Sequence, residues 1–187
     1  YVQDEASQLC TSLIKDVNES TVVTDVCACP GGKSFGAALD MKNKGRIISS
    51  DLHKNKLSLI EKGAKKLGID IIETVPRDAR VPDEALFGIA DRVICDVPCS
   101  GIGVIGSKPE IRYKDASDFA GLYPTQAKIL ENALSYLKNG GRAVYSTCTV
   151  NRFENGNIVH SVLNNKEGFR LVSERTILPG NGYDGFY

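Results

Sequence analysis

The stretch that most constrains the fold of this chain is Val-Val-Thr-Asp-Val-Cys-Ala-Cys-Pro-Gly-Gly-Lys at residues 22–33. Its β-branched first half predicts a buried strand, and the Pro-Gly-Gly that follows predicts a tight turn into a helix. Where a parallel strand passes into a helix through glycines, backbone N–H groups face outward and the chain can lie against a ligand. The stretch therefore predicts a cofactor site at the carboxyl end of the first strand.

Strand and helix patterns alternate along the rest of the chain. We expect strands at residues 22–26, 46–50, 69–75, 91–95, 143–146 and 169–173, and the start of another at 184–187. We expect helices within 1–15, at 34–41, over 57–67 with Gly68 closing it, over a stretch around 129–137 that ends at 139–141, and at 157–163. Residues 98–109 predict a long irregular loop, rich in Gly and Pro. This alternation is typical of a parallel, doubly wound sheet that binds ligands at the carboxyl ends of its strands.

Length and charge limit the number of domains and the kinds of partner that this chain can have. A chain of 187 residues suits a single domain. Its 23 basic and 23 acidic residues give no net charge, so no overall positive field indicates a nucleic acid partner. No apolar run approaches the roughly 20 residues that a membrane helix needs. We expect a cytoplasmic monomer, excised from a longer protein because the chain opens at Tyr1 in structured-looking sequence.

Six cysteines, at positions 10, 27, 29, 95, 99 and 148, raise the possibility of zinc or disulfides. Against both, there is no Cys-x-x-Cys pair and there are only two histidines. Reduced thiols are the default in a chain without export signals, so we expect no metal site. Cys10 and Cys95 are candidates for small buried hydrophobic residues.

Two acids follow the second and third predicted strands. A carboxylate at Asp51 can accept both hydroxyls of a ribose, although an Asp there also suits the N-cap of the next helix. Asp78 has the same possible role, with a simple Asp-Ala-Arg loop as the alternative. The first turn lacks Gly-x-Gly-x-x-Gly, and Lys33-Ser34 only approximates a P-loop. A nucleoside cofactor without phosphates, such as S-adenosylmethionine, fits better.

Two thiols follow neighbouring predicted strands, at Cys99 and Cys148, with Asp96 nearby. This combination suits chemistry on an unreactive ring carbon, because cytosine C5 becomes nucleophilic only after a group such as a thiolate adds to C6. A second group must then remove the C5 proton. Asp96 is a candidate to hold the N3/N4 edge of the pyrimidine, and Lys33 to offset charge on the ring. Either cysteine alone could equally be core packing, and spacing does not say which one attacks.

The chain resembles the Nol1/Nop2/Sun family of RNA cytosine-5 methyltransferases. The resemblance rests on residues 25–33, 96–101 (Asp-Val-Pro-Cys-Ser-Gly) and 146–149 (Ser-Thr-Cys-Thr), with further matches at 3–7, 108–113, Gln126, 129–130 and 184–186. Lys-Pro-Glu-Ile-Arg-Tyr at 108–113 is similar to the bacterial Sun branch, which methylates small-subunit ribosomal RNA. The family has alanine where Cys29 stands.

The resemblance implies a three-layer, Rossmann-like class I S-adenosylmethionine-dependent methyltransferase fold, with a mostly parallel seven-stranded sheet that contains an antiparallel strand. It implies one catalytic domain over 1–187, without the helical RNA-binding domain that precedes it in Sun-type enzymes. Cys148 would be the nucleophile, and Cys99 would act in proton removal and product release, with Asp96 and Lys33 beside them. The cofactor residues would be Cys27, Ala28, Cys29, Pro30, Gly31, Gly32, Lys33, Asp51, Asp78 and Asp96.

Three other functions stay open. One is a methyltransferase for transfer RNA, and another is one for small molecules or exocyclic amines. Amine methylation of bases usually uses Asp/Asn-Pro-Pro-aromatic, whereas Cys99 follows Pro98 here. The third is a non-catalytic scaffold of the same fold in ribosome assembly, against which Cys99, Cys148 and Lys33 argue.

Overall fold

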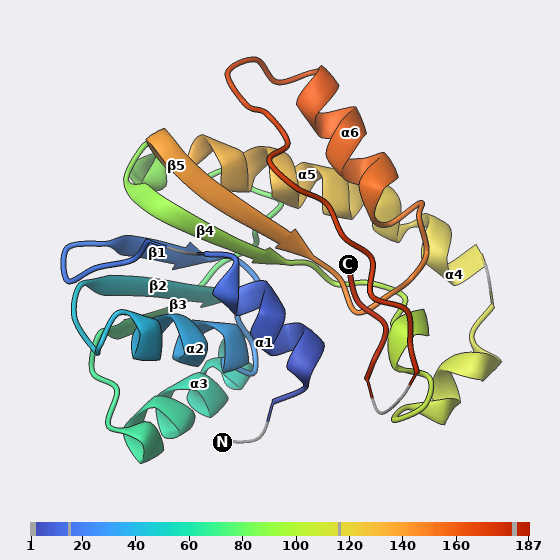
Figure 1. The fold of residues 1–187 in the computed structure, drawn as a ribbon, viewed down its shortest axis with the longest axis horizontal. Helices are drawn as coiled ribbons and strands as arrows, with labels where there is room; N and C mark the ends of the chain where they lie inside the picture. The colour runs from blue at the N-terminus through green and yellow to red at the C-terminus, as the bar shows by residue number, and fades with distance from the viewer. Residues whose placement is uncertain (1–2, 15, 116, 181–182) are drawn as a thin grey trace.

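The sheet organises the molecule. The computed structural model describes residues 3–14, 16–115, 117–180 and 183–187, and five strands within them form one parallel sheet in the order β3-β2-β1-β4-β5 (Figure 1). The strands are β1 (Val22–Asp25), β2 (Arg46–Asp51), β3 (Ile72–Pro76), β4 (Ala90–Asp96) and β5 (Leu137–Ser146). All four neighbouring pairs are parallel, which confirms the predicted doubly wound arrangement.

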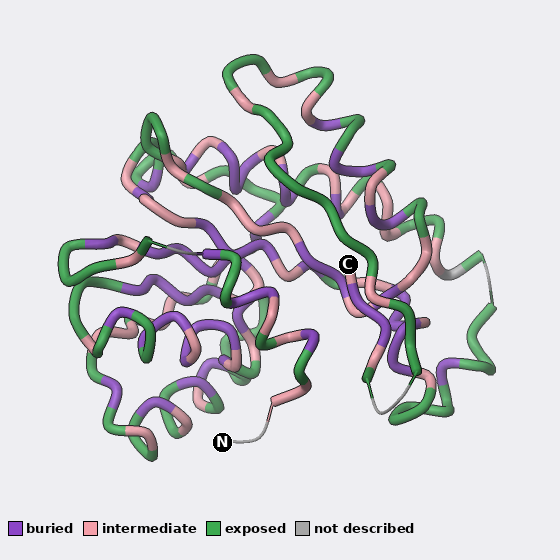
Figure 2. Tube along the Cα trace, viewed as in Figure 1, coloured by how far each residue is buried: buried purple, intermediate pink, exposed green. Residues whose placement is uncertain are grey.

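Helices cover both faces of the sheet and make a three-layer fold (Figure 1). The α-helices are α1 (Glu5–Ser12), α2 (Gly32–Asp40), α3 (Lys54–Leu67), α4 (Ser117–Ala120), α5 (Leu122–Ser135) and α6 (Gly156–Asn164). The 3₁₀ turns are η1 (Glu84–Leu86), η2 (Ile102–Val104) and η3 (Pro109–Tyr113). One core packs α2 and α3 against the sheet, and a second core packs α5 and α6 against its other face. Figure 2 shows that the central strands β1, β2 and β4 are mostly buried between these layers, whereas the edge strands β3 and β5 are more exposed.

The helix α3 follows its predicted pattern closely. Leu57, Ile60 and Ala64 are buried on one face, and Gly68 ends the helix with φ +67°. The Ile69 N–H bonds to the Ala64 carbonyl at 2.9 Å, and the Gly68 N–H bonds to the Lys65 carbonyl at 3.3 Å. These two bonds make a Schellman cap. Because Ile69 belongs to this cap, β3 begins at residue 72 and not at the predicted residue 69.

The predicted stop of the next long helix at 139–141 is wrong. The helix α5 ends at Ser135, and β5 begins at Leu137 and runs through both glycines. Leu137 lies opposite Ala90 and Arg142 lies opposite Arg92, so β5 holds extra residues here. Gly140, at φ +79°, accommodates this bulge. A glycine predicted to mark the end of a helix therefore marks a bulge in a strand.

The predicted seven-stranded sheet with an antiparallel strand is also wrong for the described residues, which contain five strands, all parallel. Residues 169–173 are irregular, and Leu171 and Val172 are 39% and 73% exposed. Their apolar sequence suits a strand, but no described strand pairs with them, and strand propensity depends on such a partner. Residues 184–187 form only isolated contacts, including an antiparallel bridge between Ile177 and Phe186.

Two further expectations concern the chain start and the loop after β4. The helix predicted within 1–15 is α1, while residues 1, 2 and 15 lie outside the described part. The loop predicted to be irregular over 98–109 contains the 3₁₀ turn η2, and η3 follows it. Among the described residues, no helix is long and apolar enough to cross a membrane.

Candidate active site

The turn after β1 is the predicted cofactor side of the site. Gly31 is the N-cap of α2 and has φ +112°, which L side chains rarely adopt. A Cβ added there would lie 2.6 Å from Cζ of Phe35, so only glycine fits against this ring. The Ala28 N–H donates to the Ser50 carbonyl at 2.8 Å and fixes the turn to the end of β2. The backbone of residues 27–32 can therefore lie directly against a ligand.

Asp51 lies beside this turn, at the end of β2. Its carboxylate accepts the Cys29 N–H at 3.3 Å and the His53 N–H at 3.0 Å. His53 is the N-cap of α3, so the alternative that Asp51 caps the helix is wrong. Each carboxylate oxygen accepts only one of these bonds and keeps lone pairs for hydroxyl donors.

Asp78 is already engaged by a neighbour. Arg80 holds its carboxylate with side-chain contacts of 2.6 to 3.1 Å and a backbone bond of 3.0 Å. These Arg80 hydrogen bonds lower the pKa of Asp78. A ligand at Asp78 would have to share the carboxylate with Arg80.

Lys33 and Asp96 form an ion pair between the turn and the end of β4. The two atoms Lys33 Nζ and Asp96 Oδ2 lie 2.7 Å apart, and Ser146 Oγ donates to the other carboxylate oxygen at 2.7 Å. Burial disfavours the charged amine, but the charge and hydrogen bond of Asp96 outweigh this and raise the pKa of Lys33. The Lys33 amine also lies 4.9 Å from the ring centre of Phe186. Lys33 therefore fixes the Asp96 carboxylate at the end of β4.

The two predicted thiols are in contact. Cys99 Sγ and Cys148 Sγ lie 3.1 Å apart, at the ends of the adjoining strands β4 and β5. The hydrogen bond between the two thiols lowers the pKa of Cys148, Lys108 acts in the same direction, and burial and Asp96 oppose them. The same bond, together with burial, raises the pKa of Cys99. The pair is thus asymmetric, with Cys148 the more readily ionised sulfur.

Glycine contacts hold the loop after β4 against the loop after β5. The Gly103 N–H donates to the Cys148 carbonyl at 3.1 Å, and the Gly103 carbonyl accepts the Gly185 N–H at 2.7 Å. A Cβ on Gly103 would lie 2.0 Å from the Gly185 carbonyl oxygen, so this three-way contact requires glycine. Thr147 and Tyr187 also exchange two backbone hydrogen bonds of 3.0 Å each.

The remaining cysteines separate into two groups: Cys10 and Cys95 are buried, and Cys27 and Cys29 of the turn are half-buried. Cys10 and Cys95 are buried, at 6% and 0% exposure, which confirms the prediction for both. Burial raises the pKa of Cys27, which lies in the turn itself. All six are free thiols, and no group of three or more possible metal ligands occurs among the residues that the structure describes.

Sequence reasoning missed two buried carboxylates near the site. Asp25, at the end of β1, is 1% exposed, and burial raises its pKa to about 7. Ser34 Oγ donates to its Oδ2 at 2.7 Å, while its Oδ1 has no hydrogen-bond partner. Glu154, after β5, is 0% exposed. Asp25 lies within the stretch 22–33, so its place at the end of the first strand could have indicated it. No pattern in the sequence indicates Glu154.

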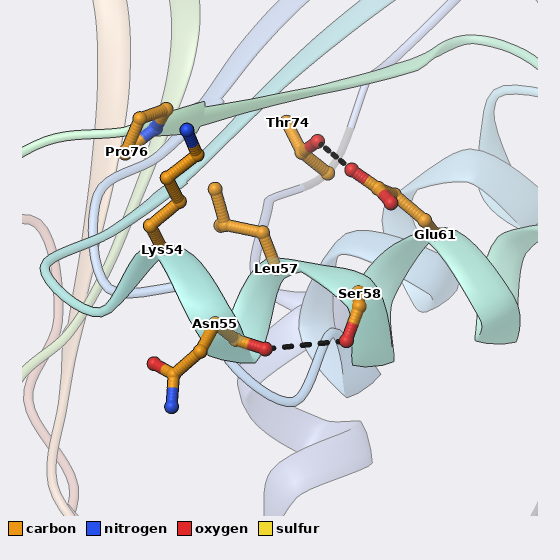
Figure 3. Close-up of a pocket in the computed structure, with 7 residues that line it drawn as sticks. All are labelled: Lys54, Asn55, Leu57, Ser58, Glu61, Thr74 and Pro76. Carbon is orange, nitrogen blue, oxygen red and sulfur yellow. Dashed lines mark hydrogen bonds between the residues drawn. The ribbon is translucent and has the colours of Figure 1, made fainter.

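A surface hollow of about 630 Å³ lies between α3 and β3 (Figure 3), and its lining residue Pro76 pairs with Asp51 in the sheet. Side chains of α3 and the edge strand β3 line it: Lys54, Asn55, Leu57, Ser58, Glu61, Thr74 and Pro76. It contains neither thiol and none of the predicted site residues, so volume alone does not identify the reacting site here.

Comparisons with known proteins show the family of this chain. The family model for 16S rRNA methyltransferase RsmB/F matches residues 12–183. The probable ribosomal RNA small subunit methyltransferase B of Bacillus subtilis is 42% identical over 170 residues, which is 90% of this chain and 38% of that protein. Ribosomal RNA small subunit methyltransferase F of Shewanella piezotolerans is 32% identical over 162 residues, which is 84% of this chain and 34% of that protein. The chain therefore spans little more than a third of these relatives.

A solved structure agrees over the whole chain. The crystal structure of NSun6 from Pyrococcus horikoshii with SFG superposes with a TM-score of 0.81 at 30% identity, covering 100% of this chain and 51% of that one. The fold is accordingly the Rossmann-like fold of S-adenosylmethionine-dependent methyltransferases.

Proposed function

Because this chain belongs to the 16S rRNA methyltransferase RsmB/F family, we propose that residues 1–187 are the catalytic domain of an enzyme that methylates C5 of a cytosine in RNA, namely small-subunit ribosomal RNA. The observation that carries the proposal is the 3.1 Å contact between Cys99 and Cys148 beside Asp96. Methylation of an amine or a hydroxyl needs no such pair of thiols. Methylation of C5 of a pyrimidine needs one group that adds to C6 and a second group that removes the C5 proton.

S-adenosylmethionine is the cofactor of this family, and the residues present fit it. The turn at residues 27–32 offers bare backbone where a Cβ at Gly31 would clash, and Asp51 keeps acceptor capacity for ribose hydroxyls. The turn offers no P-loop for phosphates, which agrees with a nucleoside sulfonium. When bound, the cofactor supplies an electrophilic methyl group.

Cys148 begins the reaction in this proposal. Its sulfur forms a bond to C6 of the cytosine, and the electron pair of the C5–C6 double bond makes C5 nucleophilic. The lowered pKa of Cys148 supports this assignment, since the thiolate is the attacking species. C5 then gains the methyl group and still carries its proton.

Cys99 completes the reaction by removing that proton. Before attack it is the thiol that donates to Cys148, and the hydrogen bond and charge of Cys148 help to raise the pKa of Cys99. Both effects end once the Cys148 sulfur is bonded to C6, so Cys99 can lose its own proton to solvent and accept the one on C5. The C5–C6 double bond then re-forms and Cys148 leaves as a thiolate.

Asp96 favours cytosine over uracil in this scheme. Lys33 and Ser146 donate to its two oxygens, so the group is an acceptor toward the base. The 4-amino group of cytosine is a donor, whereas uracil presents an acceptor at that position. A uracil would leave two acceptors facing each other, which a polar site rejects strongly.

Methyl transfer by the protein to small-subunit ribosomal RNA, located by bisulfite sequencing, tests the proposal. We expect one cytosine to be methylated, the same cytosine to be unmodified in a strain without the gene, and no transfer when uracil replaces it. Methylation of transfer RNA alone would contradict the ribosomal substrate. Cofactor binding without any transfer would favour an assembly scaffold and contradict the enzyme.

A further inference from the structure

A second contact lies behind the two thiols. The residue that follows each cysteine is a hydroxyl, and Ser100 Oγ and Thr149 Oγ1 lie 2.9 Å apart, both buried. The loop after β4 and the loop after β5 are therefore joined twice, once through sulfur and once through oxygen. Whatever fixes Ser100 also fixes the position of Cys99 relative to Cys148.

Glu154 fixes Ser100. One carboxylate oxygen, Oε2, accepts the Ser100 backbone N–H at 2.8 Å and Gln126 Nε2 at 3.0 Å. The other, Oε1, accepts Asn151 Nδ2 at 2.9 Å. In the described part of the chain Glu154 forms no ion pair, so its two buried side-chain oxygens are satisfied by N–H donors alone. Such burial is costly unless those bonds are well made.

Gln126 connects the same carboxylate to the other side of Cys99. It lies on α5, is 0% exposed, and donates through Nε2 to the Pro98 carbonyl at 2.9 Å as well as to Glu154. Its Oε1 is buried without a hydrogen-bond partner. The amide nitrogen thus donates to the Pro98 carbonyl, in the loop that carries Cys99, while the amide oxygen has no hydrogen bond. An unsatisfied buried oxygen destabilises the folded state.

Glu154 also belongs to the loop that carries Cys148. Its neighbour Asn155 accepts Thr147 Oγ1 at 2.6 Å and donates to the Thr149 carbonyl at 3.0 Å. The residues on both sides of Cys148 are therefore tied to the segment that bears Glu154. One carboxylate bridges the two cysteine loops.

We propose that Glu154, with Gln126, is a positioning residue that holds Cys99 against Cys148 and so maintains the thiol contact on which methyl transfer depends. Its role in turnover rests on the function proposed above, whereas its effect on the thiols does not. A purely structural role is the competing explanation, but apolar residues of similar volume would fill the same space at lower cost, which argues against it.

The experiment compares Glu154→Gln with the matched surface variant Glu131→Gln. The pH dependence of Cys148 alkylation by iodoacetamide is followed in the intact protein by mass spectrometry of the Cys148 peptide. We expect the midpoint for Glu154→Gln to move upward, because Cys99 donates less well to Cys148, and the midpoint for Glu131→Gln to match the wild type. Methylation by Glu154→Gln should fall about tenfold to a hundredfold at saturating cofactor, the scale expected for a misplaced reacting group.

A second variant keeps the test decisive if Glu154→Gln folds poorly. Gln126→Met has similar length but loses the donors to Pro98 and Glu154, and it should raise the same midpoint. An unchanged midpoint in a folded Glu154 or Gln126 variant would overturn the proposal. If the alkylation midpoint of Cys148 rises in the variants but the wild-type protein methylates no RNA, the result would contradict the proposed function and leave the positioning role intact.

Discussion

The two halves of the site are built in different ways. The proposed cofactor half is one continuous turn after β1, shaped by glycine backbone and joined to the end of β2. The thiol half is assembled from the loop after β4, the loop after β5, α5 and the chain around Gly185. Binding of a nucleoside needs a shaped backbone, which one short segment can supply. The proposed covalent chemistry uses two sulfurs at contact distance, and here they come from cysteines 49 positions apart in the sequence.

The largest effect should come from the thiol half. Cys148→Ala should abolish methylation and any covalent RNA adduct, because no other side chain can form the bond to C6. Cofactor binding, measured by titration calorimetry, should stay at the wild-type value, because Cys148 lies in the loop after β5 and not in the turn after β1. Cys95→Ala is the control with a buried sulfur and should retain the adduct. Loss of cofactor binding in Cys148→Ala would contradict the separation of the two halves.

The buried acid Asp25, at the end of β1 before the turn, should make the stability of the protein depend on pH. Its pKa is raised from 3.8 to about 7, so the folded protein keeps a proton that the unfolded chain releases. Stability therefore falls as pH rises from about 4 to about 7. Asp25→Asn removes this dependence, and its advantage over the wild type should grow across that window by about 1–4 kcal/mol, at 1.36 kcal/mol per pKa unit. Urea unfolding at several pH values measures it, and a constant difference would show that Asp25 is not buried as a neutral acid.

Gly31 tests the shape of the turn. Gly31→Ala should weaken S-adenosylmethionine binding about tenfold, because an L residue at a strained φ costs about 1–3 kcal/mol and its Cβ would meet Phe35. Gly106→Ala is the matched control, since a Cβ there has no atom within 4 Å. Calorimetry on both variants distinguishes them, and equal affinities would mean that the turn does not touch the cofactor.

Asp51 should give the smallest effect. Asp51→Asn keeps an acceptor but loses the charge, so we expect cofactor affinity to fall about twofold to tenfold, the scale of one hydrogen bond. Asp40→Asn, at the exposed end of α2, should bind the cofactor like the wild type. The alkylation midpoint of Cys148 should be unchanged in both variants. A shifted midpoint in Asp51→Asn would show that the two halves are coupled.

The same difference explains what could be predicted from the sequence. The turn at residues 22–33 and the strand-end acids are local patterns, so the turn into α2 and the parallel sheet were predictable. Spacing could place Cys99 and Cys148 at adjoining strand ends but could not say which one ionises, because that depends on their hydrogen bond. Glu154 could not be found, since its role arises from contacts with Ser100 and Gln126 far along the chain. Residues 169–173 misled the prediction because a strand also needs a partner.

The behaviour of Cys99→Ala tests the central claim most directly. The variant is incubated with substrate RNA and S-adenosylmethionine and run on a denaturing gel. Cys148 can still add to C6, but the C5 proton is not removed, so a covalent RNA–protein complex should accumulate while product is lost. The variant lacking both thiols should give no complex. Normal turnover by Cys99→Ala, without trapped RNA, would contradict the assignment of the two sulfurs.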